Sequence, residues 1–269
     1  MVEAQRSKTD RLKIVAKTII VLPTYNEAEN LPLLMEELFA LPVENLHVLV
    51  VDDNSPDGTG AIADRLAGQH PGRAHVLHRA EKAGLGPAYV AGLKRALSLG
   101  ADLIIQMDAD FSHPPRYIPD LLAAIEHHDL VIGSRYVKGG SVDEHWSFYR
   151  KALSWFANRM YAASILRTRV RDATSGFRVW RRQALVGLDL DRIRSNGYIF
   201  LVEMTYIARR LGYRIQEVPI HFPDRKRGDS KMNVRIQLEA AFRLWQIVYR
   251  HHALNPHMRR TEAYSVEVS

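Results

Sequence analysis

The chain has 269 residues, of which 46% are hydrophobic and 25% charged, as in folded globular proteins that bury a sizeable core. Because it contains no cysteine, a disulfide framework, a thiolate metal site and a cysteine nucleophile are all excluded. The formal net charge of +7 favours an anionic partner, which leaves nucleic acid, an acidic membrane and phosphorylated ligands open.

The two ends of the sequence are polar. Residues 1–17 have mixed charge and lack the continuous apolar core of a signal peptide. No stretch approaches the roughly 20 apolar residues that span a bilayer. We therefore expect polar tails at residues 1–17 and 251–269 and no transmembrane segment. If the substrate is a lipid, the protein should act from the membrane surface.

Short apolar segments alternate with segments of helical periodicity through the first half of the chain. The pattern predicts helices near residues 31–38, 86–99 and 118–125. Strands are predicted at residues 18–22, 47–51, 76–78, 103–107 and 130–132. Such alternation predicts an α/β fold with a largely parallel sheet and right-handed crossovers.

The second half is less regular. Helices are predicted at residues 148–166, 199–211 and 234–249, and a strand at residues 214–218. The sequence has no internal repeat, low-complexity segment or flexible linker. We therefore expect a single domain over residues 18–250.

Polar residues follow three of the predicted strands, at residues 23–27, 52–55 and 108–110. In a parallel sheet these strand ends lie on one edge, where open α/β sheets bind ligands. Asp108 and Asp110 are two positions apart, so in extended backbone both can point to the same side and share a divalent cation. A strand that ends in a polar turn is the alternative for each segment alone.

Two further segments belong to the same edge. Residues 82–86 (KAGLG) lead into a helix and can offer main-chain N–H groups and a cation to an anion, although a plain loop before a helix is the simpler interpretation. Arg135 follows the fifth strand, where it faces the same crevice or is an ordinary surface arginine.

Several motifs occur in a fixed order: LPTYNE at 22–27, VDDNSPDG at 51–58, KAGLG at 82–86, DADFSHPP at 108–115, GSR at 133–135, DATSGF at 172–177 and EVPIHFPDRKRGDSK at 217–231. In this order they resemble the inverting glycosyltransferases of family 2, over residues 18 to 250. The resemblance implies a GT-A-like, Rossmann-type sheet flanked by helices. Within the family, the basic segment that ends at Lys231 points to the branch that moves mannose from GDP-mannose to polyprenyl or dolichyl phosphate with inversion.

The resemblance also implies roles for individual residues. It divides the domain into a nucleotide-binding half, residues 18–135, and an acceptor and membrane-facing half, residues 136–250. A Mg²⁺ or Mn²⁺ ion is implied at Asp108 and Asp110. Some relatives have a glutamine ligand where this chain has Ser112, so water is the alternative third ligand. The nucleotide-sugar contacts implied are Pro23, Tyr25, Glu27, Val51, Asp53, Asp108, Ala109, Asp110, Arg135, Arg225 and Lys231. The catalytic residues implied are Asp110, Arg135 and Arg225, and the lipid-phosphate contacts are Arg135, Arg150 and Ser154.

The chemistry of the residues supports these roles. A lipid phosphate is already anionic near neutral pH, so it needs little or no general base. The barrier lies in bringing two anions together and in stabilising the departing nucleoside diphosphate, for which arginines and a metal are suited. The basic segment 225–231 contains Gly228, which favours a lid over phosphates, although a solvated basic patch is the alternative.

Two of the predicted helices, 148–166 and 234–249, align aromatic and aliphatic residues beside basic ones. Such a face either belongs to the core or lies in the interface of an anionic membrane. We expect peripheral association with the cytoplasmic face of a membrane, with a separate membrane-anchoring subunit as a possible partner and no nucleic acid. A UDP-glucose-dependent transferase of the same type is the main alternative function; a nucleotidyltransferase and a basic nucleic-acid-binding protein are weaker ones.

Overall fold

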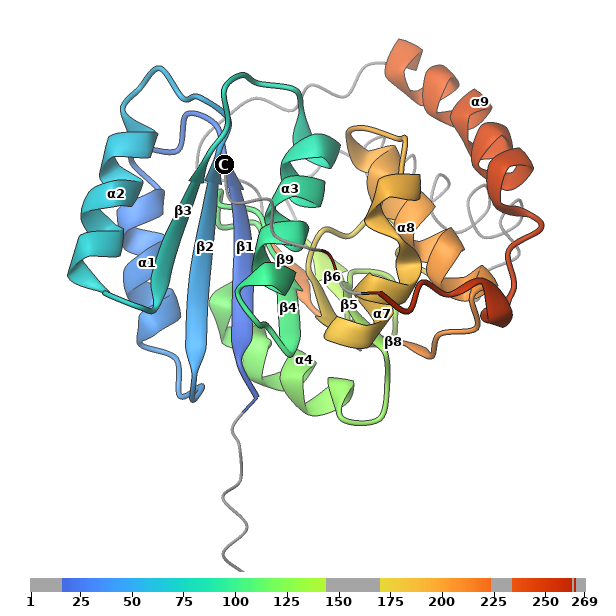
Figure 1. The fold of residues 1–269 in the computed structure, drawn as a ribbon, viewed down its shortest axis with the longest axis horizontal. Helices are drawn as coiled ribbons and strands as arrows, with labels where there is room; N and C mark the ends of the chain where they lie inside the picture. The colour runs from blue at the N-terminus through green and yellow to red at the C-terminus, as the bar shows by residue number, and fades with distance from the viewer. Residues whose placement is uncertain (1–15, 144–169, 224–233, 263, 265–269) are drawn as a thin grey trace, which may run out of the picture.

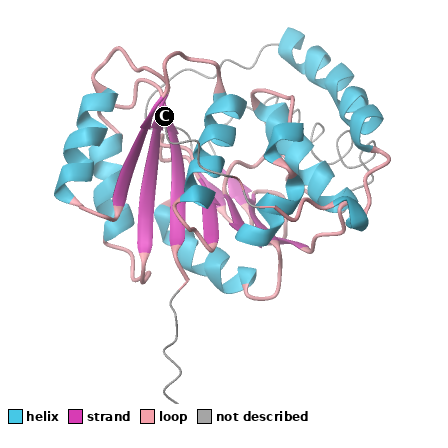
Figure 2. Cartoon of the chain, in the orientation of Figure 1, coloured by secondary structure: helices cyan, strands magenta, loops and turns pink. Residues whose placement is uncertain are grey.

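The computed structural model describes residues 16–143, 170–223, 234–262 and 264, and for residues 234–242 it describes the helical backbone alone. Its centre is a seven-stranded sheet in the order β3-β2-β1-β4-β7-β5-β8 (Figures 1 and 2). The strands are β1 (Thr18–Thr24), β2 (Leu46–Asp52), β3 (Ala74–His78), β4 (Leu103–Gln106), β5 (Leu130–Ser134), β7 (Arg178–Arg181) and β8 (Ile215–Pro219).

All of the strand pairs in this sheet are parallel except those of β7, which runs antiparallel to both β4 and β5. A second, small sheet pairs β6 (Ser141–Val142) with β9 (His221–Phe222) in parallel. The predicted α/β fold with a largely parallel sheet is confirmed.

Helices cover both faces of the large sheet (Figure 1). One face packs against α3 (Leu85–Ser98), α7 (Arg182–Leu188) and α8 (Tyr198–Arg210), and α9 (Val234–His251) packs against α8. The other packs against α1 (Leu31–Phe39), α2 (Thr59–Gln69) and α4 (Ile118–Ile125). Short 3₁₀ turns occur at Pro115–Tyr117, Leu190–Arg192 and Pro256–Met258.

Burial on both faces explains why the strands are continuous apolar runs. Ile19 and Val21 of β1 enter the core beneath α3, whereas Ile20 and Leu22 enter the core beneath α1. Alternate side chains of a strand point to opposite faces, so a strand covered on both sides has no polar face.

The strands and helices predicted in the first half agree with the structure to within one or two residues at most ends. The sequence pattern does not predict α2, β7 or α7, and the predicted helix at residues 148–166 lies outside the described residues. The predicted boundary at residue 250 falls inside α9, which ends at His251, and the following Leu254 is buried in the core. Among the described helices, none is both long and apolar enough to cross a membrane.

Candidate active site

The three polar strand ends lie side by side at one edge of the sheet. β1 pairs in parallel with both β2 and β4, and Thr24 is in register with Asp52. The main chain ties these ends together, because the N–H of Asp53 donates to the carbonyl of Thr24 at 3.0 Å. The predicted juxtaposition of residues 23–27, 52–55 and 108–110 is therefore confirmed.

Hydrogen bonds join the turn after β1 to the segment after β2. The N–H groups of Asn26 and Glu27 donate to the hydroxyls of Ser55 at 3.1 Å and Thr59 at 2.9 Å. Asn26 adopts a left-handed conformation with φ of 61°, which asparagine tolerates better than most residues. These bonds use the polar side chains of the second turn, so that segment fixes the first one in place.

Two charged contacts flank this pair of turns. The ammonium of Lys82 lies 3.3 Å from the centre of the Tyr25 ring. Arg79, directly after β3, forms a short ion pair with the buried carboxylate of Asp53. Val51, in contrast, is fully buried in the core, so its side chain packs beneath the edge rather than facing it. The nucleotide roles of Pro23, Tyr25, Glu27, Val51 and Asp53 stay predictions.

The two carboxylates after β4 are held by neighbours on several elements. The hydroxyl of Tyr89 on α3 donates to Oδ1 of Asp108 at 2.9 Å. Burial first, and then the charge of Asp108, raise the pKa of Tyr89 well above its ordinary value, so the phenol stays a donor. Oδ1 of Asp110 accepts the N–H of Ser112 at 3.0 Å. Hydrogen bonds from Tyr89 and Ser112 thus orient the carboxylates of Asp108 and Asp110.

The main-chain N–H of Asp108 donates to Nδ1 of His113 at 3.0 Å. This bond requires Nδ1 to be unprotonated. Burial lowers the pKa of His113, although the charges of Asp108 and Asp110 act in the opposite direction. The imidazole is therefore neutral and serves to fix the backbone of the motif.

The donor set suits a hard divalent cation. Two carboxylates lie at the edge, and within the described chain the Oγ atom of Ser112 is buried without a hydrogen-bond partner. An orphaned hydroxyl beside carboxylates suits a metal ion or its bound water. The described residues contain no cluster of three histidine, cysteine or acidic side chains placed to hold a metal. The assignment of Mg²⁺ or Mn²⁺ to Asp108 and Asp110, with Ser112 beside them, stays a prediction.

The segment before β7 closes the site from the other side. At Gly176, an added Cβ would lie 3.6 Å from both carboxylate oxygens of Asp108 and 3.1 Å from Cε1 of His113. An added Cβ would therefore make ordinary contact with the carboxylate but a tight contact with the His113 ring. β7 brings this glycine to the edge because it is antiparallel, so its beginning meets the end of β4.

Arg135 is bound by the same segment. Its Nε and Nη2 donate to the fully buried carboxylate of Asp172 at 2.7 and 2.6 Å, and Nη2 also donates to Thr174 at 2.8 Å. Burial lowers the pKa of Arg135, but the charge and hydrogen bonds of Asp172 outweigh burial and raise it overall. The guanidinium is thus a fixed positive charge, and its role toward phosphate stays a prediction.

A second buried guanidinium, that of Arg178, binds three main-chain carbonyls. It donates to Ala173 and Ser175 at 2.7 Å and to Leu201 at 2.9 Å. Burial lowers the pKa of Arg178 to about 9, which leaves it protonated at neutral pH. This residue fixes the segment that carries Asp172 and Gly176.

Four predicted site residues lie outside the described residues: Arg150, Ser154, Arg225 and Lys231. Sequence reasoning, for its part, assigned no role to Arg79, Tyr89 or His113. The rule that located the other strand ends would have found Arg79, since it directly follows β3. Tyr89 carries no comparable signal, because its contact with Asp108 joins residues on different elements.

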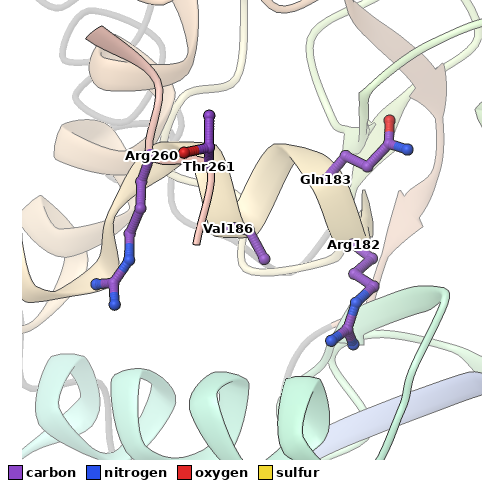
Figure 3. A pocket seen from close by; sticks show the side chains of 5 residues that line it. All are labelled: Arg182, Gln183, Val186, Arg260 and Thr261. Atoms are coloured by element: carbon purple, nitrogen blue, oxygen red, sulfur yellow. The ribbon is translucent and has the colours of Figure 1, made fainter. Parts of the chain in front are cut away.

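A separate pocket of about 320 Å³ is lined by Arg182, Gln183, Val186, Arg260 and Thr261 (Figure 3). Arg182 donates to the carbonyl of Leu97 at 2.7 Å, and Arg260 donates to Asp189 at 3.1 Å. The main-chain N–H of Arg182 donates to the carbonyl of Asp102, just before β4 begins. The carboxylates of Asp108 and Asp110 follow the end of β4, so the pocket lies at the opposite end of this strand.

Known proteins resemble this chain over most of its length. A model of the family "Glycosyl transferase family 2" matches residues 19–187. The chain is 46% identical over 230 residues to a polyprenol monophosphomannose synthase of Mycolicibacterium smegmatis, covering 85% of each chain. It is 48% identical over 225 residues to an undecaprenyl-phosphate mannosyltransferase of Micrococcus luteus, covering 83% of this chain and 90% of that one.

Solved structures with the same fold are more distant in sequence. A glucosyl-3-phosphoglycerate synthase of Mycobacterium tuberculosis, solved with Mn²⁺, uridine diphosphate and phosphoglyceric acid, has a TM-score of 0.61 and 20% identity, covering 87% of this chain and 78% of that one. A mannosyl-3-phosphoglycerate synthase of Rubrobacter xylanophilus has a TM-score of 0.56 and 17% identity, covering 94% and 79%. These likenesses bear out the predicted GT-A-like fold.

Proposed function

The chain belongs to glycosyl transferase family 2, and from that premise we propose that it transfers mannose from GDP-mannose to a polyprenyl phosphate with inversion at the anomeric carbon. The observation that carries the proposal is its identity of 46% and 48%, over most of both chains, with relatives named for mannose and a polyprenyl phosphate. The products are polyprenyl phosphate mannose and GDP.

The edge of the sheet supports the donor half of this proposal. We assign the nucleoside to the turns around Tyr25 and Asp53, and the diphosphate to Asp108 and Asp110 through a divalent cation. When bound, such a cation stabilises the charge that develops on the leaving diphosphate. The Mn²⁺ and uridine diphosphate named for one distant structure agree with this chemistry, although that likeness by itself concerns only the fold.

The acceptor half follows from charge. A phosphate monoester oxygen is already a nucleophile at neutral pH, so the chain needs to position it rather than deprotonate it. Arg135 suits this task, since Asp172 and Thr174 fix its orientation and a rigid guanidinium recognises phosphate well. We assign Arg150, Ser154, Arg225 and Lys231 to the same anionic groups by family resemblance. Attack opposite the departing diphosphate gives inversion.

A lipid acceptor requires access to a membrane, and α9 supports peripheral binding. Leu244 and Ile247 of this helix are buried, while Trp245 is 60% exposed and Tyr249 is 80% exposed. The adjacent Arg250 is exposed as well. Exposed aromatic and basic residues on one helix suit an anionic interface. We propose that the chain works at the cytoplasmic face of a membrane, where an anchoring subunit is an additional partner to look for.

The test is a transfer assay with purified protein, a short polyprenyl phosphate, Mg²⁺ or Mn²⁺ and labelled sugar nucleotides. We expect an organic-soluble mannolipid from GDP-mannose, with the β-linkage that inversion of an α-linked donor produces. A glucolipid from UDP-glucose in its place would identify the alternative donor, and no glycolipid from any donor would refute polyprenyl phosphate as the acceptor.

The metal assignment has its own test. Asp110→Ala should lower metal-dependent turnover by more than about 100-fold, because a carboxylate at the leaving group is lost. Asp120→Ala removes an exposed carboxylate from the first turn of α4 and should keep near-normal turnover. Near-normal activity of Asp110→Ala, with an unchanged dependence on metal concentration, would contradict the assignment.

A further inference from the structure

Residues 82–86, which we call the glycine loop, join the two parts of the proposed donor site. At its start, Lys82 lies over the ring of Tyr25. At its end the loop begins α3, and one turn later Tyr89 donates to Asp108 at 2.9 Å. A shift of the loop would therefore disturb the proposed nucleoside contact and the proposed metal ligand together.

The side-chain amide of Asn196 binds the glycine loop at two points. Its Oδ1 accepts the N–H of Gly86 at 3.0 Å, across 110 residues of sequence, and its Nδ2 donates to the carbonyl of Ala83 at 2.9 Å. Oδ1 also accepts the N–H of Gly197 at 2.7 Å. One asparagine thus holds the loop against the beginning of α8, which lies beside α3 (Figure 1).

The two glycines of the loop have no room for a side chain, because Asn196 and its neighbour Ser195 occupy the space. A Cβ on Gly84 would come within 2.5 Å of Nδ2 of Asn196, and a Cβ on Gly86 would come within 2.7 Å of the carbonyl oxygen of Ser195. Gly84 also has a φ of +99°, which side chains other than hydrogen rarely allow. The loop and the turn at 195–197 are therefore complementary surfaces in direct contact.

Asn196 itself rests on a buried support. Glu203 of α8 is fully buried, and its Oε2 accepts the N–H groups of Arg194 at 3.1 Å and Ser195 at 2.8 Å. Its other oxygen, Oε1, lies 2.8 Å from Nε2 of His251 at the end of α9. Burial raises the pKa of Glu203, but these hydrogen bonds outweigh it and lower the pKa overall. The turn that presents the amide is consequently rigid.

We propose that Asn196 is a positioning residue for the nucleotide-sugar donor, which it serves by fixing the glycine loop; the proposal rests on the function proposed above. Asn196 is itself an exposed residue, so its replacement leaves the two cores intact. The loss should therefore appear in donor binding rather than in global stability.

The experiment compares Asn196→Ala, Asn196→Asp and the control Asn255→Ala. Asn255 is another exposed asparagine whose Oδ1 accepts a main-chain N–H, that of His257 at 3.0 Å, but it lies after α9. Asn196→Asp keeps an acceptor for Gly86 and loses the donor to Ala83. Calorimetry would give the Kd for GDP with Mn²⁺, and hydrogen exchange would report on the Gly86 amide.

We expect Asn196→Ala to weaken GDP binding about tenfold, to raise KM for GDP-mannose more than it lowers kcat, and to speed exchange at Gly86. Asn196→Asp should be intermediate, Asn255→Ala should match the wild type, and the unfolding midpoint should stay within error. Wild-type GDP binding by Asn196→Ala, or an equal loss in Asn255→Ala, would overturn the positioning role.

The two proposals fail in different ways. If the wild type binds GDP with Mn²⁺ but makes no mannolipid, the proposed reaction is wrong, and the effect of Asn196→Ala on GDP binding and on Gly86 exchange still decides the positioning role. A wild-type chain that binds neither GDP nor UDP in the presence of metal would overturn both.

Discussion

His47 and His75 stack on each other at the beginnings of β2 and β3, with their ring centres 5.9 Å apart. Burial lowers the pKa of both imidazoles, and the positive charge of Lys17 lowers each further. The charge of Arg73 also lowers the pKa of His47, and that of Arg95 lowers the pKa of His75. Nδ1 of His47 and Nε2 of His75 are buried and have no hydrogen-bond partner among the described residues. Both rings are therefore harder to protonate in the folded chain than in the unfolded chain.

This pair should make stability depend on pH. The unfolded chain binds protons near the ordinary histidine pKa of 6.5, whereas the folded chain binds them only at lower pH. The contribution is therefore fully present above pH 6.5 and is lost as the pH falls below it. Urea unfolding at pH 7.5 and 5.5 should show a smaller loss of unfolding free energy for His47→Phe combined with His75→Phe than for the wild type. Equal losses would contradict the assignment.

Single residues also mark how far the sequence predicts the site. Asp53, Asp108 and Asp110 could be located because each follows an apolar strand, and strand ends converge in a parallel sheet. Asn196 could not be located, because its bond to Gly86 spans 110 residues and leaves no local pattern. Contacts of this kind depend on how two helices pack, which the spacing of residues within one helix does not encode.

At the scale of elements, α3 packs unusually close to the sheet at Gly92. A Cβ at this position would come within 2.5 Å of Cγ1 of Val21 and 2.8 Å of Cγ2 of Val51. Both valines are fully buried strand residues, so neither can yield without moving a strand. The glycine thereby sets the distance between α3 and the strands that end at the proposed site.

Gly92→Ala should lower the unfolding free energy by about 1–3 kcal/mol, because the added methyl group overpacks this contact. Gly68→Ala is the matched control, since Gly68 is exposed on α2 and an added Cβ would meet nothing within 4 Å. That change should raise stability by up to about 1 kcal/mol, through better helix propensity. Urea unfolding compares the two, and destabilisation of equal size would show that close packing is not the cause.

The strand β7 is not predicted from the sequence, and its residues explain why. Its sequence, Arg-Val-Trp-Arg from Arg178 to Arg181, begins with a charged residue that a strand pattern assigns to solvent. Arg178 is nevertheless fully buried, because carbonyls from residues 173, 175 and 201 satisfy its guanidinium. Those acceptors exist only in the folded chain, so no local pattern reveals the strand or its antiparallel direction.

At the scale of the whole molecule, the segment after α9 returns to the domain. Leu254 is buried in the core, and the guanidinium of Arg259 donates to the carbonyl of Leu211 at 2.9 and 2.7 Å. Arg260 pairs with Asp189 at 3.1 Å, and the hydroxyl of Tyr264 accepts a short hydrogen bond from the N–H of Leu190. These contacts tie the end of the described chain to α7 and α8.

A chain that ends at residue 250 should lose roughly 3 kcal/mol of unfolding free energy, because it loses the burial of Leu254 and one partner of the buried Glu203, His251. A chain that ends at residue 264 keeps every contact described above and should unfold near the wild-type midpoint. Urea unfolding of both would check this. A midpoint for the shorter chain equal to that of the longer one would mean that the returning segment adds nothing to stability.

The position of β7 also has a consequence for synthesis on the ribosome. β7 lies between β4 and β5 in the sheet but follows both in the chain, and in the described residues β5 pairs only with β7 and β8. The unit of β1 to β4, with the proposed nucleotide edge, can pair as soon as it is made. β5 emerges next but, among the described strands, has none to pair with until β7 is made, and until then one edge of β4 stays unpaired. We expect the nascent chain to complete its donor side first and to close the sheet only after β7 and β8 have been released.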